Sequence, residues 1–247
     1  MPGSVIGKSL NLGYPGSISR SADAIIANRL FRATDTGTIP FGSPVVLNPD
    51  NTYSAFGSVA STLAAALTLS TAYTTLTVAA LPNAVDVGDL VTLVSGADNQ
   101  TTTVAVAAAA GATTLTVASF TANFAYPIGT TVTISNTFAQ FAGVAAREVK
   151  QSTDYFAAQG EYLPGQPCDV IERGSVTVTC NVGTPVAGGA VYVRIAANAG
   201  IPTGVVGGFE AAADGTNTIQ LTNVMWKTGK IDANKVAEVT ILTRVNP

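Results

Sequence analysis

Three carboxylates in the second half of the chain have the residue type and the spacing that acid and nucleophilic catalysis would require. Glu161, Asp169 and Glu172 lie close together in the sequence, and a pair of carboxylates supplies the acid and the nucleophile of a glycosidase. Trp226, the single tryptophan, is available as a sugar platform. Surface carboxylates without a catalytic role are common, so the pattern favours a solvated loop over an active site.

Other common catalytic and metal-binding sites lack the side chains they require. The chain contains no histidine, so it cannot form a Ser-His-Asp triad or a Cys-His pair, and zinc would find only two thiols and carboxylates. Cys168 and Cys180 are interpreted as small buried residues, and whether they pair stays open. Asp86 and Asp89 lie three positions apart, but no full oxygen shell for calcium is visible near them, so we interpret them as turn carboxylates. We expect no metal, no cofactor and no catalytic residues.

Composition and charge indicate a β protein that binds neither nucleic acid nor a membrane. Of the 247 residues, 47% are hydrophobic and 11% are charged, and the abundance of Gly, Ala, Thr and Val suits short strands joined by turns. The net charge of −3 comes without any Lys/Arg cluster, which disfavours nucleic acid as a partner. No apolar run approaches the roughly 20 residues of a membrane helix, and the start lacks a secretory signature. We expect synthesis in a host cytoplasm.

One short block of the sequence is duplicated. The hexapeptide TTLTVA occupies 74–79 and again 113–118, and a Gly-led strand follows each copy, at 88–93 and at 129–134. Such a unit buries its inward-facing Leu and Val only when a second unit packs against it. The surrounding segment 62–136 has no Lys or Arg, unlike the rest of the chain. We predict an inserted β domain over 62–136, built as two halves of one core.

The segments on both sides of this insertion are predicted to form one discontinuous β core, 34–61 joined to 137–247. Their apolar residues mostly alternate with polar ones, as in half-buried antiparallel strands. Insertions are tolerated at exposed loop tips, which is consistent with this division. The expected core strands are 45–47, 53–56, 141–150, 174–180, 189–195, 218–221 and 237–245.

The first 33 residues are predicted to form an extended N-terminal arm. Glycines and prolines interrupt any regular element, yet the segment is too apolar for a free tail. It holds four basic residues and one Asp, a net charge of +3. The arm either adds a strand to a neighbour's sheet or wraps its own core. For 21–32 a short helix capped by Ser21 is a further alternative.

Several phrases outside the duplicated block are similar to one family. They are NLGYPGSISRSADAIIANR at 11–29, IPFGSPVVLN at 39–48, FAGVAAREVKQSTDYF at 141–156, GEYLPGQPCDVIERGSVTV at 160–178 and GGFEAAADGTNTIQLTNVMWKTGKIDANKVAEVTI at 207–241. In this order they resemble the structural cement, or head decoration, proteins of tailed bacteriophages. The resemblance covers nearly the whole chain except 62–136, which looks like an extra domain.

This resemblance implies a non-enzymatic virion protein on the outer surface of the mature capsid. Its implied partners are the major capsid protein, whose subunits it would tie together, and further copies of itself in a homotrimer. The implied core is β-tulip-like or barrel-like, and the inserted domain is expected to be a small Ig-like β-sandwich. A virion receptor-binding or carbohydrate-active surface protein is the alternative. The residues expected to contact the capsid lie in the arm: Tyr14, Arg20, Asp23, Asn28 and Arg29.

Overall fold

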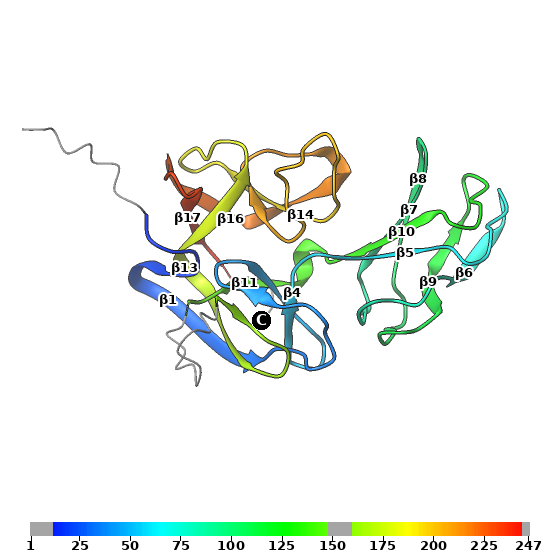
Figure 1. Ribbon diagram of the computed structural model, residues 1–247, viewed down its shortest axis with the longest axis horizontal. Coiled ribbons are helices and arrows are strands. Elements are labelled where there is room, and N and C mark those ends of the chain that lie inside the picture. Colours follow the sequence, from blue (N-terminus) through cyan, green and yellow to red (C-terminus); the bar gives the residue numbers. More distant parts are fainter. Residues whose placement is uncertain (1–11, 148–159, 244–247) are drawn as a thin grey trace, which may run out of the picture.

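The computed structural model describes residues 12–147 and 160–243, which fold almost entirely into β-strands. This confirms the predicted all-β class with a barrel core. The helical segments are short, η1 (Phe138–Gln140) and η2 (Gly215–Asn217). Figure 1 shows the core strands on one side of the molecule and the strands of 58–135, hereafter the module, on the other.

The largest sheet has nine strands and closes on itself. The order β15-β14-β16-β17-β13 returns to its start because β13 also pairs with β15, and these five strands form a closed barrel. The strands β11, β3 and β4 continue the sheet beyond β13, and β1 pairs with β13 as well. Their bounds are β1 (Ile18–Leu30), β3 (Pro44–Leu47), β4 (Tyr53–Ala55), β11 (Phe141–Ala145), β13 (Pro167–Val182), β14 (Ala190–Arg194), β15 (Phe209–Glu210), β16 (Thr218–Ile231) and β17 (Val236–Ile241).

Alternate side chains of the barrel strands fill its interior. Successive residues of a strand point to opposite faces, and Val176, Val178 and Cys180 of β13 are all buried in the same apolar cluster. Trp226 of β16 and Val239 of β17 belong to that cluster too. The barrel is therefore a packed core, and burial raises the pKa of the Cys180 thiol.

The first half of β13 packs in a second apolar cluster. An isolated parallel bridge between Phe31 and Tyr53 connects the end of β1 to β4. Both aromatic rings are buried there with Tyr162 and Val170. Beside them, β2 (Ile39–Pro40) pairs with β12 (Glu161–Tyr162). One strand of sixteen residues thus supports two cores, which explains why so much of β13 is buried.

The module consists of two small sheets over a separate apolar cluster. The order in the first sheet is β5-β10-β7-β8, and the second contains β6 and β9. β5, which straddles the predicted boundary at residue 62, pairs with β10. The bounds are β5 (Ser58–Thr62), β6 (Ala72–Thr77), β7 (Leu90–Ser95), β8 (Asp98–Thr103), β9 (Thr114–Thr121) and β10 (Thr131–Ser135).

The two sequence copies pair with each other around a local two-fold axis. In the β6–β9 ladder Leu76 lies opposite Leu115, the same letter of the hexapeptide, and in the β7–β10 ladder Thr92 lies opposite Thr133. Equivalent residues facing each other in antiparallel strands define a two-fold. The isolated bridges follow the same rule, since Val85–Ala108 corresponds to Tyr126–Leu67. Both copies bury their Leu and Val side chains in the one shared cluster.

The predicted core strands overlap the observed ones, and one alternative was wrong. Residues 21–30 belong to strand β1 and do not form a helix capped by Ser21. Pairing with the long β13 overrides the local helix signal, and the β-branched Ile25 and Ile26 suit a strand. The expected strand 141–150 is β11, which ends at Ala145, and 148–150 lie outside the described residues. Of the arm, residues 1–11 lie outside them too.

Candidate functional site

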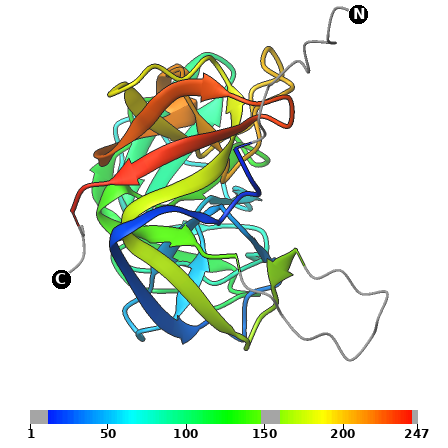
Figure 2. The same ribbon diagram turned by 90° about the vertical axis from the view of Figure 1, so that its left-hand side faces the viewer.

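Strand β1 carries four exposed apolar side chains on the surface of the core. Ile18, Ile25, Ile26 and Leu30 expose between 40% and 55% of their surface on this strand. The ladder of β1 shifts register repeatedly against β13, and such bulges are common at sheet edges. Figure 2 looks at the core from the side away from the module, and β1 runs across that side in blue. We call the exposed side chains of 18–20 and 23–30 the β1 face.

Tyr14 lies in the turn that precedes β1. Its ring is 67% exposed, and the Arg147 guanidinium lies over it at 4.6 Å from the ring centre. The Tyr14 carbonyl accepts a hydrogen bond of 2.6 Å from the Thr177 hydroxyl of β13. Gly16 follows with a φ of +82°, which favours glycine. The turn is thus fixed to this chain's own sheet, and the ring remains at the surface.

Three of the predicted contact residues bind partners in this chain. Arg20 pairs with Glu238 of β17 at 3.0 Å, and Asp23 pairs with Arg173 of β13 at 2.9 Å. The Asn28 amide donates to the Asp169 carboxylate. Exposed ion pairs contribute about 0–1 kcal/mol, so these contacts position β1 more than they stabilise it. The partners Arg173 and Glu238 lie far away in the chain, and no local signal in the sequence marks them.

Arg29 differs from the other predicted contact residues. Its Nε is buried without a hydrogen-bond partner among the described residues, and its guanidinium lies 5.5 Å from the ring centre of Tyr53. Tyr53 in turn donates to Glu172 at 3.2 Å, and burial, followed by Glu172, raises the pKa of Tyr53. The structure therefore places Arg20, Asp23, Asn28 and Arg29 along one strand, with Tyr14 before it, and gathers none of them into a catalytic pocket.

The carboxylates considered for sugar chemistry are not assembled with an aromatic platform. Trp226 is 1% exposed inside the barrel, so its ring cannot stack on a sugar. Glu172 is 3% exposed and accepts the Tyr53 hydroxyl. Glu161 accepts from the Thr38 hydroxyl at 2.7 Å, and Asp169 accepts from Asn28. Each carboxylate thus has an observed structural role.

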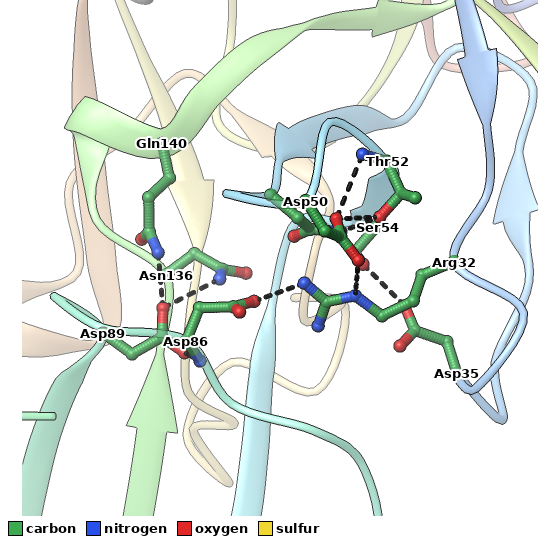
Figure 3. Close-up of polar contacts among 10 residues, drawn as sticks. Arg32, Asp35, Asp50, Thr52, Ser54, Asp86, Asp89, Asn136 and Gln140 are labelled. Carbon is green, nitrogen blue, oxygen red and sulfur yellow. Dashed lines mark hydrogen bonds and ion pairs between the residues drawn. The ribbon is translucent and has the colours of Figure 1, made fainter. Parts of the chain in front are cut away.

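A polar cluster, drawn in Figure 3, fills the junction between the core and the module. Arg32 Nη2 lies 2.7 Å from Asp86 Oδ2, and Arg32 Nε lies 3.8 Å from Asp50 Oδ2. Asp89 accepts from Gln140 Nε2 at 2.6 Å through one oxygen and from the Asp86 backbone N–H through the other. Burial raises the pKa of Asp89. These are the two aspartates that the sequence had suggested as turn residues.

The junction contains a partly open cavity of about 220 Å³, lined by both polar and apolar residues. Asp35 lies at its edge, accepts from the Ser54 hydroxyl at 2.6 Å, and has its pKa raised by burial. Within 12–147 and 160–243, no three His, Cys, Asp or Glu side chains converge as metal ligands would. The cavity's carboxylates are instead occupied by Arg32, Gln140 and neighbouring hydroxyls.

The two cysteines lie on the same strand, β13. Cys168 and Cys180 are both buried, and neither is part of a disulfide. Twelve positions along one strand separate them by roughly 40 Å, at 3.3 Å per residue, so they cannot form a disulfide with each other.

In the part of the chain that the structure describes, no helix has the length and apolar character to cross a membrane.

Comparison with known families identifies the class as phage capsid-associated proteins. The model described as XM1 gp53 minor capsid protein matches residues 92–241, more than half of the chain. The chain therefore belongs to the XM1 gp53 minor capsid protein family. No curated protein matches the sequence. Membership supports a structural role in the virion, and the match runs from the module through the end of β17.

Proposed function

We propose that this chain is a non-enzymatic decoration, or cement, protein of a tailed phage. It binds the outside of the mature head through the β1 face and ties major capsid protein subunits together. The observation that carries this proposal is the position of the β1 face. It lies along β1, which begins on the side of the core away from the module (Figures 1 and 2) and runs toward the junction, where Arg32 follows it. A protein docked by that face would leave the module projecting from the particle.

The chemistry of the β1 face fits a protein surface. Isolated exposed apolar residues are ordinary, but Ile18, Ile25, Ile26 and Leu30 share one strand at the rim of a sheet. Such a strand offers apolar side chains and main-chain hydrogen-bonding groups to a partner. The predicted contacts Tyr14, Arg20, Asp23, Asn28 and Arg29 belong to this proposed surface or border it.

Binding of this protein would stabilise the assembled capsid lattice by mass action. A ligand that binds the assembled lattice and not its separated subunits stabilises the lattice by RT ln(1 + [L]/Kd), about 2.7 kcal/mol at 100 times Kd. Attachment as a homotrimer would multiply this effect without a strong single contact. The proposal therefore needs no active site and no cofactor, and neither nucleic acid nor a membrane is a partner.

The test uses expanded heads that lack the protein. Adding the parent protein should decorate them and raise their disruption temperature. Ile26→Glu/Leu30→Glu should lose more than tenfold in affinity, because charges at the contact would be desolvated. Ile128→Glu, a matched change at a 68% exposed isoleucine of the module, should bind like the parent. Equal binding by the β1 double variant, or no thermal effect of the parent, would refute the proposal.

A module deletion tests the orientation separately. Gly57 and Asn136 are hydrogen-bonded to each other, so a short Gly-Ser linker can replace 58–135. The shortened protein should still decorate heads. Loss of attachment by a folded deletion variant would place the docking surface on the module. Deleting 1–33 is a poorer test than substitution, because it removes strand β1 and the buried Phe31.

A further inference from the structure

Two adjacent chain crossings join the module to the core. The Gly57 N–H donates to the Asn136 side-chain oxygen at 2.9 Å, and the Asn136 N–H donates to the Gly57 carbonyl at 3.1 Å. Both crossings therefore meet at one point. Adjacent crossings of this kind are the usual place of a hinge, so other contacts must fix the angle between the two parts.

Among the described residues, the side-chain hydrogen bonds and ion pairs that join the module to the core come from one loop of the module, 83–89. Its partners on the core are Arg32 and Thr36 near the end of β1, and Gln140 in η1. The contacts are Arg32 Nη2 to Asp86 Oδ2 at 2.7 Å, Thr36 Oγ1 donating to Asn83 Oδ1 at 2.6 Å, and Gln140 Nε2 donating to Asp89 Oδ1 at 2.6 Å.

The second copy of the duplicated unit contains the equivalent loop, 124–130, in the same conformation. Each loop ends in a turn with a left-handed glycine, Gly88 at φ +93° and Gly129 at φ +86°. The turn hydrogen bonds match as well, from the 89 N–H to the 86 carbonyl at 3.2 Å and from the 130 N–H to the 127 carbonyl at 3.1 Å. The fold of the module thus gives the turns of both loops the same backbone conformation.

The side chains of the two loops differ completely where the first loop meets the core. The hydrogen bonds of the second loop to described residues stay within the module, and the loop carries no carboxylate or amide at the matching positions. Asn83, Asp86 and Asp89 correspond to Phe124, Pro127 and Thr130. The local fold therefore does not require the polar residues of the first loop. Their common property is that each bonds to a core side chain.

We propose that Asn83, Asp86 and Asp89 form a clasp that locks the module at one angle to the core. Arg32 is the central partner, because its side chain is only 10% exposed and faces two aspartates, Asp86 and Asp50. Partly desolvated charge pairs are directional and stronger than exposed ones. The clasp makes the module a rigid projection. This inference does not depend on capsid binding.

Spin-label distance measurements on the full chain test the clasp. Labels at Ala97→Cys in the module and Ala233→Cys in the core occupy exposed positions, while Cys168 and Cys180 are buried. With the clasp intact, the distance distribution should be narrow. Asn83→Ala/Asp86→Ala should widen it roughly twofold as the hinge is released. The matched control at the equivalent loop, Phe124→Ala/Pro127→Ala, should leave it narrow.

Three outcomes would overturn the clasp: a broad distribution in the parent, a narrow one in Asn83→Ala/Asp86→Ala, or equal broadening in the control. Asp86→Asn keeps the side-chain shape and removes only the charge, so it supplies a milder variant that should broaden the distribution to a smaller extent. Far-UV circular dichroism and the melting temperature establish that each variant is folded. Binding to heads is not measured, so failure of the cement proposal would leave this result unaffected.

Discussion

Replacing Arg194 by Met should strongly destabilise the five-strand barrel. The Arg194 and Glu210 side chains are fully buried and paired through two hydrogen bonds, one of 2.9 Å between Nη2 and Oε2. Nη1 also reaches Asp214 Oδ2 at 2.7 Å. The pair links β14 to β15, the strand whose pairing with β13 closes the barrel. In the variant, the Glu210 carboxylate loses its cation and stays buried.

The expected loss of folding stability follows from the burial of the Arg194–Glu210 pair. Removing one partner of a buried ion pair costs about 3–5 kcal/mol, because the remaining charge is left uncompensated. A domain is stable by only about 5–15 kcal/mol, so the loss is a large fraction of the total. Replacing both partners by apolar residues of similar volume is often neutral or stabilising. Arg194→Met/Glu210→Met should therefore be more stable than Arg194→Met by about 3 kcal/mol or more.

Urea unfolding followed by tryptophan fluorescence measures both variants. Trp226 is the single tryptophan and is buried in the same barrel, so its emission reports on this part of the molecule and not on the module. An unchanged dependence of the unfolding free energy on urea concentration would show that the variants have the same folded and unfolded states as the parent. The reasoning is refuted if Arg194→Met stays within about 1 kcal/mol of the parent, or if the double variant is no more stable than the single one.

Three further predictions concern charge, packing and thiols. Hydrogen bonds from Asn198 and then Arg194 lower the pKa of Asp214 below its ordinary 3.8. The stability that it contributes is therefore present above that pH and lost below it, and Asp214→Asn should flatten the acid limb of a stability–pH curve. Leu76→Ala and Leu115→Ala, related by the two-fold, should each cost about 2–5 kcal/mol and raise hydrogen exchange in the module but not in the barrel. Both cysteines should react with a thiol reagent only after denaturation, because both are buried and neither is in a disulfide.

Much of the fold follows from short-range patterns in the sequence. Alternation of apolar and polar residues predicted the strands of the core, and the repeated TTLTVA predicted two halves that bury each other's Leu and Val. The observed pairing of Leu76 with Leu115 gives this expectation a definite geometry. Such patterns are local, with a period of two along a strand, which is why a single sequence reveals them.

The parts that escaped prediction depend on contacts far apart in the chain. The stretch 21–32 contains residues compatible with either a helix or a strand, and only the free edge of β13 decides between them. The partners of Arg20 and Asp23 lie 218 and 150 positions away. Asp86 and Asp89 appeared to be ordinary turn residues, because their role needs Arg32 and Gln140, which approach from the core.

The same pairing of charges bears on how a decoration protein can bind. Arg20, Arg32, Arg173 and Arg194 all pair with carboxylates of this chain. On the β1 face, the charges of Arg20 and Asp23 are thus already paired, and the exposed side chains without such pairing are mainly the apolar ones. Contacts of that kind depend on shape and register more than on long-range attraction. Attachment through the β1 face would then require a partner surface of matching geometry, which an assembled lattice provides and scattered subunits do not.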